Sequence, residues 1–215
     1  MSDCPDRTLP IDLALDQCAD QVAGGGILLS EALSKIGSHG FCFAAFLLAV
    51  PFVQPIPVGP LAMVGAFGFM ALGWQMVRGH EVPTLPKSAG GLRIQGRLWL
   101  GVIAFARKLL KTCRIFTRQR FEPLIEGVRG RQLVGALIFT GGALLAIPVA
   151  SLPLNNFFPA LMIIFACLAW IERDGMMLLV SLVWGVATLV YFALVAVALL
   201  FFGKQVWAWM TPFAA

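Results

Sequence analysis

Apolar runs and polar junctions alternate along most of the chain, and four or five of the runs approach the length of a membrane helix. The hydrocarbon of a bilayer is about 30 Å thick, so a helix that spans it needs roughly 20 apolar residues. The run 176–203 contains no charged residue and predicts one complete transmembrane helix. The other four runs are shorter and cover residues 41–53, 61–77, 132–150 and 157–171.

The first two runs are joined by VPFVQPIPVGP, residues 50–60, which contains four prolines and no charge. Proline lacks a backbone N–H and clashes with the preceding turn, so no regular helix crosses this stretch. It is either an ordinary turn between membrane helices or a re-entrant element held inside the membrane. The run 41–53 is about 20 Å long as a helix, which favours the re-entrant interpretation. The second turn, SLPLNNFFP, has a similar character, and the polar candidates in the two turns are Gln54, Asn155 and Asn156.

A faint internal repeat relates the two turns and the helices that follow them. A shift of 96 residues places PIPVGPLAMVGAFGFMALGWQMVRG over SLPLNNFFPALMIIFACLAWIERDG without a gap, with Trp74 on Trp170 and Gly79 on Gly175. The shared order of proline turn, apolar helix, tryptophan and glycine predicts two hairpins that enter the membrane from the same side. Such a parallel repeat would have its axis along the membrane normal. Asn155 and Asn156 also precede the apolar run 157–171, where helix capping is their ordinary role.

The composition predicts a membrane protein, and the distribution of charge predicts its orientation in the membrane. Hydrophobic residues make up 59% of the chain and charged residues only 13%, against about 25% charged in soluble domains. Of the 16 Lys and Arg residues, 12 lie between Arg78 and Arg131, with three acids. Because Lys and Arg collect on cytoplasmic flanks, this basic middle predicts a cytoplasmic segment, a cytoplasmic N-terminus and a periplasmic C-terminus. The first 20 residues lack the basic and apolar regions of a secretory signal.

Two amphipathic segments are expected to lie on the inner leaflet. Residues 92–121 have an apolar centre that is too short to span the membrane and is bounded by cations. These cations either lie at the membrane interface near anionic headgroups or form a pocket for a lipid-linked phosphate. The candidates for contact with lipid headgroups are Arg97, Arg107, Lys108 and Lys111. The segment GILLSEALSKIG, residues 26–37, places its apolar residues on one face of a helix.

Charged residues lie at the edges of the apolar runs and not within them. One cluster follows the second run and another follows the fourth, with His39 before the first run; the candidates are Arg78, His80, Glu81, Glu172, Arg173 and Asp174. They are either the charged residues that ordinarily lie at the cytoplasmic ends of membrane helices, or they form an ion pair or a headgroup site between the two repeats. No nucleophile–base motif, nucleotide-binding motif or metal-ligand spacing is visible, so no catalytic residue, metal, cofactor or nucleic-acid partner is expected.

Several stretches resemble the ExoD family of bacterial membrane proteins. They are LLSEALSKIGSHGF, LLAVPFVQPIPVGP, LGWQMVRGHEVPTLP and LPLNNFFPALMIIFACLAWIERDGMMLLV, and together they cover roughly residues 28–203. The chain departs from the pattern at Thr84, where an aromatic residue is expected. The resemblance implies an inner-membrane location, a link to exopolysaccharide synthesis and tolerance of alkaline conditions. It supplies no catalytic residues.

We therefore expect an all-α integral membrane protein with two short proline-broken hairpins, a basic amphipathic helix on the cytoplasmic face and one long C-terminal transmembrane helix. The expected function is a non-enzymatic role in exopolysaccharide synthesis or export; the alternative is a small transporter or lipid-carrier flippase built from two re-entrant hairpins. Membrane lipids, lipid-linked polysaccharide intermediates, the synthesis machinery and further copies of the chain are the partners considered. The expected segments are 1–37, 38–79, 80–131, 132–175, 176–203 and 204–215.

Overall fold

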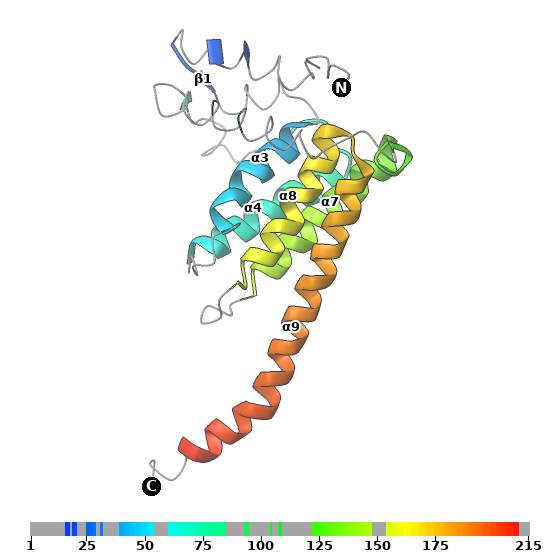
Figure 1. The fold of residues 1–215 in the computed structure, drawn as a ribbon. Coiled ribbons are helices and arrows are strands. Elements are labelled where there is room, and N and C mark those ends of the chain that lie inside the picture. The colour runs from blue at the N-terminus through cyan, green and yellow to red at the C-terminus, as the bar shows by residue number, and fades with distance from the viewer. Residues whose placement is uncertain are drawn as a thin grey trace.

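A computed structural model describes residues 16–17, 19–20, 25–28, 31, 39–53, 60–84, 93–94, 104, 108, 122–147 and 154–210. Its main body consists of five α-helices (Figure 1): α3 (His39–Ala49), α4 (Pro60–Val77), α7 (Gly127–Leu145), α8 (Phe157–Glu172) and α9 (Gly175–Met210). Short 3₁₀ turns, η1 (Val50–Val53) and η2 (Glu122–Leu124), follow α3 and precede α7. The expectation of an all-α fold with one long apolar C-terminal helix is confirmed.

The helices α3, α4, α7 and α8 form a bundle in which α3 packs mainly on α8 and not on α4, the next helix in the sequence. The largest contacts join α4 to α7, α8 to α9, α7 to α8 and α3 to α8, whereas α3 and α4 touch much less. In Figure 1, α3 and α7 run in one direction and α4 and α8 return in the other. The starts of α3, α7 and α9 therefore lie at one end of the bundle, together with the ends of α4 and α8.

Close approach between α4 and α7 depends on glycine. A Cβ atom on Gly73 would lie 2.5 Å from the backbone nitrogen of Phe139 and 2.6 Å from the carbonyl oxygen of Gly135. One on Gly142 would lie 2.7 Å from the Cβ of Phe69. Small residues at a crossing let two helix backbones touch, which is a common way to pack helices in lipid. Large apolar side chains, including the fully buried Phe41, Phe46 and Phe69, fill the remaining core.

Helix α9 differs from the others in length and surroundings. Its 36 residues make it about 54 Å long, whereas the 16 residues of α8 extend about 24 Å. Figure 1 shows α9 leaving the bundle and continuing well past it. Gly175–Ala198 is the single candidate membrane span in the described part of the chain. The apolar side chains of this span are largely exposed, as lipid contact would require, for example at Val183, Val186 and Leu194.

The boundaries of α7 and the end of α9 differ from the expected ones. Helix α7 begins at Gly127 and not at residue 132, because its first turn is polar and gave no apolar signal. It ends at Leu145 and not at residue 150, ahead of Pro148, which cannot continue a helix. Helix α9 continues to Met210, although an outer-face tail was expected from residue 204.

The expected amphipathic segments are corrected in part. Residues Ile27–Leu28 form strand β1, which pairs antiparallel with strand β2, Arg93–Ile94. Residues 27–28 and 93–94 were both expected to be helical. The φ angles of +137° at Gly25 and +98° at Gly26 exclude a right-handed helix there, so the chain enters an extended pair. Lys108 is helical as expected, whereas Arg97, Arg107 and Lys111 lie outside the described residues.

Candidate functional site

The charged candidates lie at the end of the bundle where α4 and α8 finish and α3, α7 and α9 begin. We call this region the polar end; it comprises His39, Arg78, His80, Glu81, Arg131, Trp170, Glu172, Arg173 and Asp174. It divides into one group at the junction of α8 and α9 and another at the contact of α4 and α7.

The α8–α9 junction buries carboxylates beside the membrane helix. Asp174 is only 1% exposed, and its Oδ1 accepts a hydrogen bond from the backbone N–H of Met176 at 2.9 Å. A carboxylate at this position caps the helix and interacts favourably with the positive end of its dipole. Glu172 is 8% exposed. Between them, Arg173 adopts the left-handed conformation, with φ of 53°, and ends α8.

His39 packs against this junction from α3. Its ring centroid lies 6.3 Å from that of Trp170, and burial, followed by the positive charge of Arg173, lowers the pKa of His39 below its usual 6.5. His39 Nδ1 and Trp170 Nε1 are buried and lack hydrogen-bond partners among the described residues. Two ring nitrogens are thus gathered beside a cation, an arrangement that suits an acceptor oxygen of a headgroup or of water.

This arrangement predicts a pH-dependent stability that His39→Gln removes. A lowered pKa keeps His39 neutral in the folded protein at pH values where the unfolded chain is already protonated. The unfolded state then binds more protons, so wild-type stability should fall as the pH drops below about 6.5. We expect thermal unfolding of His39→Gln in detergent to show a flatter pH dependence.

The Arg173→Gln variant is the matched control. Removal of the neighbouring charge should bring the pKa of His39 closer to its usual value and make the acid-induced loss of stability smaller than in wild type. Equal pH slopes for wild type and His39→Gln would contradict the environment described for this histidine.

The α4–α7 group is held by stacking and close packing. The guanidinium of Arg78 lies 4.8 Å from the ring centroid of Trp74, at cation–π distance. Gly79 has a φ of 88°, and a Cβ there would lie 3.0 Å from Nη2 of Arg131. Arg131 Nε is buried and lacks a hydrogen-bond partner among the described residues. Arg131 was not among the candidates chosen from the sequence. It is the last cation before an apolar run, and this position is the sequence feature that could have identified it.

The segment after α4 is fixed by Gln75. The Oε1 atom of Gln75 accepts hydrogen bonds from the backbone N–H of Thr84 at 2.7 Å and from its hydroxyl at 2.8 Å. The ring nitrogen Nδ1 of His80 lies 3.2 Å from the carbonyl oxygen of Gln75, and Glu81 is exposed. The hydroxyl of Thr84, at the position where the family pattern led us to expect an aromatic residue, thus helps to anchor this segment.

The opposite end of the bundle holds the turn candidates. Asn155 and Asn156 are 7% and 4% exposed, so both amides are buried before α8. Asn156 occupies the N-cap position but makes no side-chain cap hydrogen bond, which corrects the capping expectation for this residue. Its backbone is in the helical region, with φ of −89° and ψ of −25°, whereas capping side chains favour an extended backbone. Gln54 lies outside the described residues.

The side chains of the polar end can hold a charged or hydrogen-bonding group. No cluster of three His, Cys, Asp or Glu side chains with metal-binding geometry occurs among the residues that the structure describes. In the part of the chain that the structure describes, the molecule is an apolar helical bundle with a polar end and one candidate membrane span.

The chain belongs to the ExoD family. The family model described as "Exopolysaccharide synthesis, ExoD" matches residues 11–194. Protein ExoD of Rhizobium meliloti (strain 1021) is 29% identical over 177 residues, which cover 82% of this chain and 73% of that relative. No solved structure matches the chain. The resemblance noted in the sequence is thus confirmed, together with its association with exopolysaccharide synthesis.

Proposed function

We propose that this protein is a non-enzymatic, multi-pass component of the bacterial inner membrane that supports exopolysaccharide synthesis or export. The family assignment carries the link to exopolysaccharide. The polar end carries the proposed role, because it gathers cations and two ring nitrogens that have no hydrogen-bond partner among the described residues, at one end of an otherwise apolar bundle. Such an end is suited to receive the headgroup of a lipid-linked intermediate or a cytoplasmic part of the synthesis machinery.

The orientation follows from the basic segment. Because Lys and Arg concentrate between residues 78 and 131, the polar end faces the cytoplasm, and α9 carries the chain towards the periplasm. Arg97, Arg107, Lys108 and Lys111 belong to the same cytoplasmic segment, where they would contact anionic headgroups.

Complementation tests this role. In a bacterium that lacks its own ExoD protein, the wild-type chain should restore exopolysaccharide output. A variant with Arg78→Gln and Arg131→Gln should reach the membrane at a normal level and restore less. Gln132→Ala, which removes an exposed polar side chain from the same end, is the control. Full restoration by the double variant would reject the polar end as the functional site.

A second candidate function, a small transporter or lipid-carrier flippase, is favoured by the helix pairing. Shifted by 96 residues, the end of α3 at Ala49 falls on Leu145, the last residue of α7, and α4 falls on α8 within one residue at each end. Under the same shift, α3 corresponds to α7 and α4 corresponds to α8. The pair α4–α7 therefore corresponds to the pair α8–α3, and both pairs are in contact. This correspondence is expected of a parallel two-fold repeat. The short α3 and α8 beside the long α9 favour re-entrant hairpins.

Cysteine accessibility distinguishes the two candidates. Gln54→Cys and Asn155→Cys are introduced into a background without the native cysteines and treated with a membrane-impermeant reagent from each side. A flippase requires labelling from both sides, and a sealed re-entrant element gives labelling from neither. Labelling from the periplasm alone would identify ordinary turns and reject the re-entrant arrangement.

A further inference from the structure

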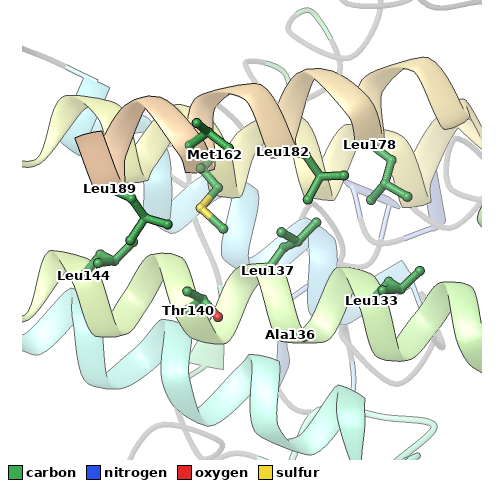
Figure 2. Close-up of a pocket in the computed structure, with 11 residues that line it drawn as sticks. Leu133, Ala136, Leu137, Thr140, Leu144, Met162, Leu178, Leu182 and Leu189 are labelled. Carbon is green, nitrogen blue, oxygen red and sulfur yellow. The ribbon is translucent and has the colours of Figure 1, made fainter. Parts of the chain in front are cut away.

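An apolar groove lies between α7 and α9, with α8 as its floor. It has a volume of about 290 Å³. Figure 2 shows side chains of α7 and α9 facing each other along it, and the lining includes Leu133, Leu137 and Leu144 of α7, Leu182 and Leu189 of α9, and Met162 of α8. Thr140 contributes the hydroxyl visible in this lining. We propose that the groove binds one acyl chain of an anionic phospholipid, with the lipid phosphate at Arg129.

The length of the groove matches one leaflet. Leu133 and Leu144, near its two ends, are 11 residues apart on α7, which corresponds to about 16 Å along the helix. Half of a hydrocarbon layer about 30 Å thick is about 15 Å. The groove therefore accommodates the chain of a lipid in a single leaflet, namely the leaflet at the polar end, where α7 and α9 begin.

Arg129 supplies the charge at the correct place. It lies four residues before Leu133, so the two share one face of α7 and Arg129 is one turn closer to the polar end. Helical side chains tilt towards the N-terminus, which carries the guanidinium further towards the headgroup region. Arg129 is exposed, and guanidinium groups bind phosphate through paired hydrogen bonds.

A helix about 10 Å in diameter is far wider than a single hydrocarbon chain. A groove of about 290 Å³ therefore suits one chain better than a helix of a second copy. The groove also ends within one leaflet, whereas a long isoprenoid chain would exceed it. These dimensions favour an acyl chain.

Native mass spectrometry of the purified full chain in detergent tests the proposal. The probes are phosphatidylglycerol, phosphatidylcholine and an isoprenoid phosphate. Wild type should retain one phosphatidylglycerol in preference to phosphatidylcholine. Arg129→Gln should weaken phosphatidylglycerol binding roughly fivefold, which corresponds to about 1 kcal/mol for one cation near an anionic surface, and Arg129→Lys should largely preserve it.

Two alanine substitutions separate the groove from the rest of the surface. Ala136 lines the groove and Ala193 is exposed on α9 outside it. Ala136→Phe should abolish retention of phosphatidylglycerol while thermal unfolding shows a folded protein, and Ala193→Phe should bind as wild type does. Unchanged retention by Ala136→Phe would overturn the site. Preferential retention of the isoprenoid phosphate, or a change of oligomeric state in Ala136→Phe, would overturn the assignment to a phospholipid.

Discussion

Gly73→Ala should destabilise the bundle by about 2–3 kcal/mol, because the added methyl group has no space at the crossing of α4 and α7. The new Cβ would lie 2.5 Å from the backbone nitrogen of Phe139 and 2.6 Å from the carbonyl oxygen of Gly135. Both are backbone atoms, so relief requires the two helices to separate. The contact between α4 and α7 is the most extensive in the molecule, which makes this separation costly. Thermal unfolding of the purified protein in detergent measures the effect.

Gly68→Ala on the same helix is the matched control. Its added Cβ would meet only the Cδ2 atom of Leu48 at 3.0 Å, at the far end of a flexible side chain. Alanine is also a better helix former than glycine by up to about 1 kcal/mol. We therefore expect Gly68→Ala to unfold close to the wild-type temperature. Equal unfolding temperatures for Gly73→Ala and Gly68→Ala would contradict the packing of α4 on α7.

Local sequence signals sufficed for most helix positions. Helix α8 was expected over residues 157–171 and ends at Glu172, because the proline–asparagine turn before it and the glycine after it are both visible in the sequence. The start of α7 was not predictable from hydrophobicity. Its first turn, GVRG, is polar and belongs to the polar end rather than to the apolar core.

The candidate site was only partly predictable, because it depends on which helices pair. Charged residues were expected at the helix ends, and they lie there. However, His39 and Trp170 are 131 positions apart, and adjacency along the chain predicts that α3 packs mainly on α4. The structure places α3 mainly on α8, which brings the two rings together. The apolar groove has the same origin, since residues of α7, α8 and α9 together line it.

Asp174→Ala should destabilise the junction of α8 and α9 by about 2–3 kcal/mol. The substitution removes the acceptor of the Met176 N–H at the start of α9, and loss of a helix cap typically costs about 0.5–2 kcal/mol. Asp174 is 1% exposed, so water does not readily replace its carboxylate, and a hydrogen bond to a charged group contributes about 1.5–3 kcal/mol, which places the loss at the upper end of these ranges. Asp174→Asn retains an acceptor oxygen without the charge and should have an intermediate effect.

Glu81→Ala provides the comparison, because it removes an exposed carboxylate from the end of α4. Thermal unfolding, membrane expression and exopolysaccharide output should decrease in the order Glu81→Ala, Asp174→Asn and Asp174→Ala. A buried cap whose loss alters the start of α9 affects the only candidate span in the described chain, so its effect on expression should exceed that of any exposed charge. Wild-type unfolding and expression in Asp174→Ala would show that this carboxylate does not hold the junction together.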